Sequence, residues 1–129
     1  MPGQNSTDIF PHKVLVIDDQ RSHLKLMRNR LSKYGCQVIT SDSAEEAMQM
    51  IQWGDHFPLI ITDLKMPWLD GAQFCKRVKA SNPEFRVVAL TGHIGTFDRE
   101  ELEGSGFDGI YEKPVTDALV RQILASARP

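Results

Sequence analysis

The stretch VLVIDDQ, residues 14–20, places four apolar residues directly before two adjacent carboxylates. An apolar run of this length, rich in β-branched residues, is typical of a strand that is buried on both faces. Asp18 and Asp19 follow at the end of that strand, where two like charges repel each other and lose hydration unless a cation or hydrogen-bond donors meet them. The stretch therefore predicts a buried strand that ends at a charged site.

The rest of the chain repeats this order of an apolar strand followed by an amphipathic helix. Ser43 and Glu46 have the spacing of a capping box before the second helix. The helix within 96–106 has few apolar anchors, so we expect it to be short and weakly held. Alternating strands and helices predict a parallel sheet that is covered by helices on both faces. The strands after the first are expected at 36–40, 58–62, 85–90 and 109–111, and the helices at about 21–34, 44–54, 71–80, 96–106 and 115–127.

Composition and charge narrow the class of protein. The 129 residues suffice for one domain with its own core, and the net charge of −2 gives no basic patch for nucleic acid. No apolar run approaches the ~20 residues of a membrane helix, and no signal-peptide segment follows Met1. Cys36 and Cys75 match no metal or redox spacing. We therefore expect a cytoplasmic domain over residues 13–129, preceded by a flexible leader at 1–12, with no direct nucleic-acid or membrane binding.

Polar side chains end four of the predicted strands. In an open parallel sheet the active crevice lies beyond the carboxyl ends of the strands, so these side chains are expected to converge. Three carboxylates in one place suit Mg²⁺, and a lysine and a hydroxyl add what phosphoryl transfer needs. Asp63 stands alone at its strand end and is the best candidate for a nucleophile that forms an aspartyl-phosphate. The converging residues are Asp18, Asp19, Asp63, Thr91 and Lys113.

These residues, in this order, resemble those of the receiver domains of two-component response regulators. The resemblance extends from Lys13 to Ala127 and rests on VLVIDDQ (14–20), LIITDLKMPWLDG (59–71), VVALTG (87–92) and YEKPV (111–115). It implies a flavodoxin-like, doubly wound α/β fold. Five parallel strands would lie in the order 2-1-3-4-5, with two of the five helices on one face and three on the other.

The resemblance also implies a role for each polar residue. Asp63 would be the phosphoacceptor and Lys113 would pair with the phosphoryl group, while Thr91 and Tyr111 would be the hydroxyl and aromatic switch residues. The bond between Lys113 and Pro114 would be cis, a geometry largely confined to bonds that precede proline. The implied ligands of a Mg²⁺ cofactor are Asp18, Asp19, Asp63 and the backbone carbonyl of Lys65.

Other polar and aromatic residues allow two interpretations. Lys65 stands two positions after Asp63, and His93 stands two positions after Thr91. In receivers these positions flank the opening to the phosphoryl group and tune its lifetime. One hypothesis is that the two residues slow self-dephosphorylation, and the other is that they are simply solvated loop residues. The four histidines show no metal-ligand spacing, and most of them are expected at the surface. Trp68 would either pack in its loop or contact a partner.

The leading hypothesis is a phosphoaccepting signalling switch in a two-component system or phosphorelay. Its expected partners are a sensor histidine kinase or phosphotransfer protein upstream and an output domain or protein downstream. It would be no enzyme beyond its own phosphorylation and dephosphorylation at Asp63. An aspartyl-nucleophile phosphatase would need a carboxylate two positions after the nucleophile. That position is Lys65 after Asp63 and Gln20 after Asp18, so the residues do not support this alternative. A pseudo-receiver that only docks should lack part of the site, and here every expected residue is present.

Overall fold

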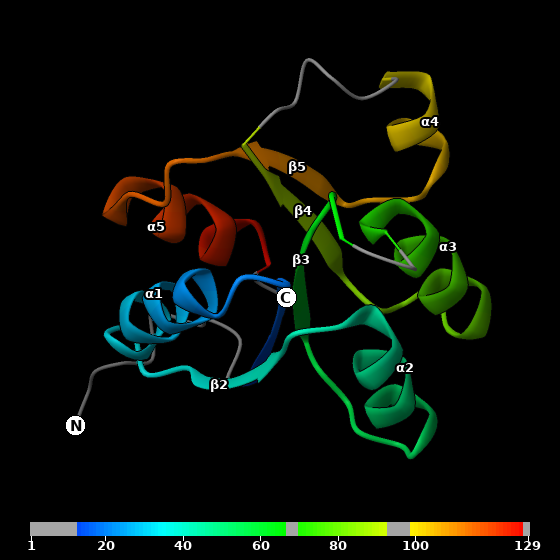
Figure 1. The fold of residues 1–129 in the computed structure, drawn as a ribbon, viewed down its shortest axis with the longest axis horizontal. Helices are drawn as coiled ribbons and strands as arrows, with labels where there is room; N and C mark the ends of the chain where they lie inside the picture. Colours follow the sequence, from blue (N-terminus) through cyan, green and yellow to red (C-terminus); the bar gives the residue numbers. More distant parts are fainter. Residues whose placement is uncertain (1–12, 67–69, 93–98, 128–129) are drawn as a thin grey trace.

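The computed structural model of the protein describes residues 13–66, 70–92 and 99–127. Its strands form one five-stranded sheet in the order β2-β1-β3-β4-β5, with every pairing parallel (Figure 1). No helix in the described part of the chain combines the length and the apolar character needed to cross a bilayer. The strands are β1 (Lys13–Ile17), β2 (Gln37–Ser41), β3 (Leu59–Asp63), β4 (Val87–Thr91) and β5 (Gly109–Glu112). The helices are α1 (Arg21–Ser32), α2 (Ala44–Gln52), α3 (Gly71–Ser81), α4 (Arg99–Gly104) and α5 (Asp117–Ser126).

The fold predicted from the resemblance is confirmed, and the helices divide between the two faces of the sheet as expected (Figure 1). Because side chains alternate along a strand, Val14 and Val16 face α1 and α5, while Leu15 and Ile17 face α2 and α3. The short helix α4 contacts the sheet mainly through Leu102. Two helices therefore cover one face and three cover the other.

The predicted elements form with shifted ends. The helix expected over 21–34 ends at Ser32, and Gly35 follows with a φ of 82°, in the left-handed region that glycine adopts without steric cost. The strand expected over 36–40 runs from Gln37 to Ser41, and the one expected over 85–90 begins at Val87. Strand ends shift because the apolar run marks what is buried, whereas the ladder of backbone hydrogen bonds decides where a strand begins.

The capping box predicted at Ser43 and Glu46 forms only in half. The Ser43 hydroxyl accepts from the backbone N–H of Glu46 at 3.1 Å, but the backbone N–H of Ser43 donates to the hydroxyl of Ser41 at 3.3 Å. The glutamate side chain is therefore not needed to satisfy that donor. A complete capping box lies instead at the start of α3, where Asp70 and Gln73 each accept from the other's backbone N–H, at 2.9 Å and 3.3 Å.

Candidate functional site

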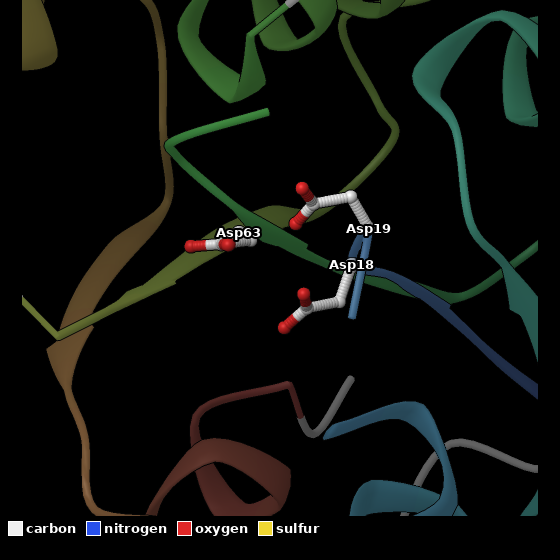
Figure 2. A group of neighbouring side chains, drawn as sticks. All are labelled: Asp18, Asp19 and Asp63. Atoms are coloured by element: carbon white, nitrogen blue, oxygen red, sulfur yellow. The ribbon is translucent and has the colours of Figure 1, made fainter. Parts of the chain in front are cut away.

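The ends of β1 and β3 bring three carboxylates together. Ile17 lies opposite Thr62 in the parallel pairing of these strands, so the following residues Asp18 and Asp63 are neighbours. With Asp19 they offer one oxygen each, and these oxygens lie within 4.8 Å of one another. Figure 2 shows the three side chains grouped at the two strand ends. The sequence predicted this grouping from the strand ends alone.

The two residues of the acidic pair differ in environment. Asp18 is buried, with 5% of its surface exposed, whereas Asp19 is exposed. The Oδ1 atom of Asp18 accepts from the backbone N–H of Gln20 at 2.9 Å, and its Oδ2 atom lies 3.3 Å from the ammonium of Lys113. Asp18 is thus fixed by hydrogen bonds, while Asp19 faces solvent from which a cation can approach.

Asp63 is half-buried at the end of the central strand β3. Burial is the main cause that raises the pKa of its carboxyl above the usual value, and the charge of Asp18 raises it further. The charge of Lys113 and backbone N–H groups, including that of Leu64 at 2.8 Å from Oδ1, act in the opposite direction. The raised pKa means that this cluster favours a further positive charge.

A hard divalent cation fits this set of donors. Mg²⁺ binds oxygen ligands, uses few protein carboxylates and keeps positions for water and phosphate oxygens. Asp18, Asp19 and Asp63 supply such oxygens from two strand ends, with burial ranging from the buried Asp18 to the exposed Asp19. The backbone carbonyl of Lys65 as a further ligand stays a prediction.

The ends of β4 and β5 add the hydroxyl and the lysine. Thr91 is the last residue of β4, has 2% of its surface exposed and lies opposite Glu112 in the pairing with β5. The backbone carbonyl of Thr91 accepts from the N–H of Lys113 at 2.8 Å. The bond between Lys113 and Pro114 is cis, as predicted. The side chain of Lys113 reaches from this position to Asp18, which directly follows β1.

The start of α3 packs tightly against the backbone of Asp63. The N–H of Gly71 donates to the carbonyl of Leu64 at 3.0 Å. A Cβ atom added to Gly71 would lie 2.2 Å from the backbone oxygen of Asp63, a distance that no side chain permits. Glycine is therefore required here, and the helix that follows is held against the strand end that carries Asp63.

Tyr111 lies on β5 and packs against the same core cluster as α5. Its ring occupies the space beside Gly109, since a Cβ atom there would lie 2.9 Å from the ring atom Cε2. The predicted aromatic switch residue is thus half-buried at the edge of the sheet, one strand away from Thr91.

Sequence reasoning missed His23. Its Nδ1 atom lies 3.1 Å from Oδ2 of Asp18 and 3.1 Å from Nζ of Lys113. Its side chain remains 37% exposed, but it contacts the candidate site and is not a purely solvated residue. His23 stands one helical turn before the buried Met27, and this spacing could have indicated that it faces the sheet.

A family model matches the stretch of chain that carries this site. The model of the response regulator receiver domain matches residues 14–125, which is most of the chain. The chain belongs to this receiver family. The receiver also has relatives among sensor kinases and among solved receiver structures.

Among curated proteins, the receiver is 30% identical over 114 residues to the autoinducer 1 sensor kinase/phosphatase LuxN of Vibrio harveyi, and 30% identical over 123 residues to the virulence sensor protein BvgS of Bordetella pertussis. It is 29% identical over 119 residues to hybrid signal transduction histidine kinase L of Dictyostelium discoideum. These matches cover 87–89% of the receiver but only 7–13% of the relatives. The receiver therefore corresponds to one small segment of each.

Solved structures agree over nearly their whole length. The receiver domain protein of Clostridium thermocellum superposes with a TM-score of 0.80 at 30% identity, covering 89% of this chain and 93% of that one. The beryllofluoride-activated NtrC4 receiver domain dimer gives 0.82 at 27% identity, with 91% and 96% covered. Chemotaxis response regulator CheY4 of Vibrio cholerae gives 0.80 at 26% identity, with 89% and 97% covered.

The residues expected to tune the receiver are only partly described. The side chain of Lys65 is exposed two positions after Asp63. His93 and Trp68 lie outside the described residues, so both interpretations of each remain predictions. Met66, between Lys65 and the undescribed 67–69, is buried with the α2 and α3 side of the core.

Proposed function

We propose that this receiver accepts a phosphoryl group from a phosphohistidine donor onto Asp63, in a reaction that depends on Mg²⁺. The observation that carries the proposal is the grouping of Asp63 with two further carboxylates within 4.8 Å, while Lys113 lies against one of them. This combination suits phosphoryl transfer, which relies on positioning and charge neutralisation more than on covalent chemistry.

The transfer uses the carboxylate of Asp63 as nucleophile. One of its oxygens bonds to phosphorus while the phosphorus–nitrogen bond of the donor breaks, and the electron pair returns to the donor imidazole, which takes up a proton from solvent. The N–H of Leu64 orients the carboxylate through its bond to Oδ1. A Mg²⁺ ion bound by Asp18, Asp19 and Asp63 would offset their mutual repulsion and the charge on the phosphoryl oxygens.

Phosphorylation then changes the charge at the sheet edge. A phosphoryl group adds about −1.5 to −2 charge, and the Lys113 ammonium and Thr91 hydroxyl at the same sheet edge would meet its oxygens. Movement of Thr91 toward the phosphoryl group leaves space that Tyr111 fills by changing rotamer. The short helix α4, which has only six residues, suits a segment that changes position in response.

The proposed upstream partner is a sensor histidine kinase or a phosphotransfer protein, and the downstream partner is an output domain or protein. The sensor kinases among the relatives support this class of partner. The alternative of a docking module without phosphotransfer has less support, because the acidic pair, the acceptor, the hydroxyl and the lysine are all present. In this proposal the receiver catalyses only its own phosphorylation and dephosphorylation.

Intact mass spectrometry after incubation with a small-molecule phosphodonor tests the proposal. The protein should gain the mass of one phosphoryl group with Mg²⁺ and none with a chelator. Asp19→Ala removes one of the exposed carboxylates. It should require at least about tenfold more Mg²⁺ for half-maximal modification, because mutation even of residues that only hydrogen-bond to metal ligands lowers metal affinity by that factor. Equal modification with and without Mg²⁺ would refute the metal-dependent mechanism.

A further inference from the structure

The ammonium of Lys113 makes its hydrogen bonds to Asp18 and His23. It lies 3.3 Å from Oδ2 of Asp18 and 3.1 Å from Nδ1 of His23. Within the described residues it makes no hydrogen bond to Asp63, on which it acts only through its charge. Before phosphorylation, the lysine is therefore held on the β1 and α1 side of the site.

The contacts of Nδ1 bear on which nitrogen of the His23 ring carries the proton. An ammonium group has donors and no acceptor, so its approach to Nδ1 requires a lone pair on that nitrogen. The 3.1 Å between Nδ1 and Oδ2 of Asp18 would by itself also fit a histidine that donates to the carboxylate. A proton on Nδ1 would add positive charge 3.1 Å from the ammonium, whereas an ammonium that donates to both Nδ1 and Oδ2 offsets the repulsion between these two acceptors. We therefore assign the proton to Nε2 and make Lys113 the donor to both His23 and Asp18.

The surroundings strengthen these hydrogen bonds. The side chains of Asp18 and Lys113 are 7% and 19% exposed, and that of His23 is 37% exposed. A cavity of about 230 Å³ adjoins them and is lined by apolar side chains that include Leu26 and Val115. Hydrogen bonds that are partly shielded from water are electrostatically stronger than exposed ones.

We propose that His23 is a positioning residue that holds Lys113 on the Asp18 side of the site and thereby opposes the phosphorylated state. The inference rests on the proposed function, because Lys113 must meet the phosphoryl oxygens for His23 to compete with them. Moving the ammonium toward those oxygens breaks its bond to Nδ1. A receiver without this acceptor should therefore bind a phosphoryl group more tightly.

Two substitutions separate the acceptor from the bulk of the side chain. His23→Leu keeps a branched side chain that suits a helix but places a methyl group where Nδ1 lies. His23→Asn keeps a carbonyl oxygen at about the same distance from Cα as Nδ1. Ser22→Ala, on the neighbouring exposed position of α1, is the matched control for a general change in the helix.

The test measures the dissociation constant of beryllofluoride, a non-hydrolysable mimic of the phosphoryl group, with saturating Mg²⁺ and ¹⁹F resonance detection. His23→Leu should tighten binding by about two- to tenfold, the effect expected for one net hydrogen bond. His23→Asn and Ser22→Ala should bind as the native protein does. In a Lys113→Met background, where native His23 has no ammonium to hold, His23→Leu should change nothing. Unchanged or weaker binding in His23→Leu, or an equal effect without Lys113, would overturn the proposal.

The ¹⁵N resonances of the native His23 ring give a second measurement that does not depend on the stability of any variant. In the metal-free protein they should show an unprotonated Nδ1 and a protonated Nε2. A protonated Nδ1 in the neutral ring would show that His23 donates to Asp18 and would refute the inference. If the native protein did not bind beryllofluoride with Mg²⁺ at all, the proposed function would fail instead, so the two failures are distinguishable.

Discussion

At the scale of single residues, Asp63 makes a contribution to stability that depends on pH. Its pKa is raised above the ordinary 3.8 mainly by burial and then by the charge of Asp18. A raised pKa in the folded state means that the proton is bound more tightly there than in the unfolded chain. The stabilisation is therefore present below the unfolded pKa and is lost as the pH rises through the folded pKa, which leaves an unfavourable charge at neutral pH.

Asp63→Asn should consequently stabilise the metal-free protein at pH 7. The neutral amide removes the charge, and the expected gain in the free energy of unfolding is about 1 kcal/mol or less, since water screens a half-buried carboxyl. Urea denaturation at several pH values should show the gain shrinking as the pH falls toward 4. The exposed Asp55→Asn is the control, and equal stability of the Asp63 variant and the native protein at pH 7 would contradict the assignment.

Lys65 allows a second test at this scale. Its exposed cation stands two positions after Asp63, and the hypothesis is that it pairs with phosphoryl oxygens and restricts water. Lys65→Ala should then shorten the lifetime of the phosphorylated protein, followed by the decay of the intact-mass adduct after the phosphodonor is removed. Lys76→Ala, at an exposed position on α3, is the control. An unaltered decay rate in Lys65→Ala would show that Lys65 is a solvated loop residue that does not affect the lifetime.

At the scale of secondary-structure elements, the junction between β3 and α3 holds the proposed phosphoacceptor in place. The capping box of Asp70 and Gln73 fixes the start of the helix. The close approach of Gly71 to the backbone oxygen of Asp63 then sets how near the helix lies to the strand end. The position of the Asp63 side chain therefore depends on a helix start as much as on the strand.

Gly71→Ala should destabilise the protein by about 2–3 kcal/mol, because the added Cβ meets backbone atoms that cannot move aside cheaply. Gly104→Ala is the matched control, since a Cβ at that position meets nothing within 4 Å. Thermal denaturation of both variants measures the difference. A Gly71→Ala protein as stable as the Gly104→Ala protein would refute this account of the junction.

At the scale of the whole molecule, the sheet order brings together residues that are far apart in the chain. β1 and β3 are neighbours, and the helices that follow them lie on opposite faces of the sheet. Open α/β sheets place their binding sites beside such a pair of strands. Asp18 and Lys113 come into contact across 95 positions of sequence in this way. The site is therefore a property of the topology and not of any local motif.

The same reasoning explains what the sequence could and could not predict. The carboxyl ends of the strands were predictable to within one residue because apolar runs stop at polar residues, and the rule for parallel sheets then placed Asp18, Asp63 and Lys113 at one edge. The contact between His23 and Lys113 was not predictable in this way, since it depends on how α1 is rotated and how far a lysine from β5 extends. The spacing of Asp70 and Gln73 permits the capping box of α3, but spacing alone does not show where a helix begins.

The central claim is that Asp63 is the residue that accepts the phosphoryl group. Intact mass spectrometry of three proteins treated with the same phosphodonor and Mg²⁺ tests it most directly: the native protein, Asp63→Asn and the exposed-site control Asp55→Asn. The native protein and the control should each gain one phosphoryl group, and Asp63→Asn should gain none, because an amide is not a nucleophile here. A stable phosphoryl adduct on Asp63→Asn would contradict the account.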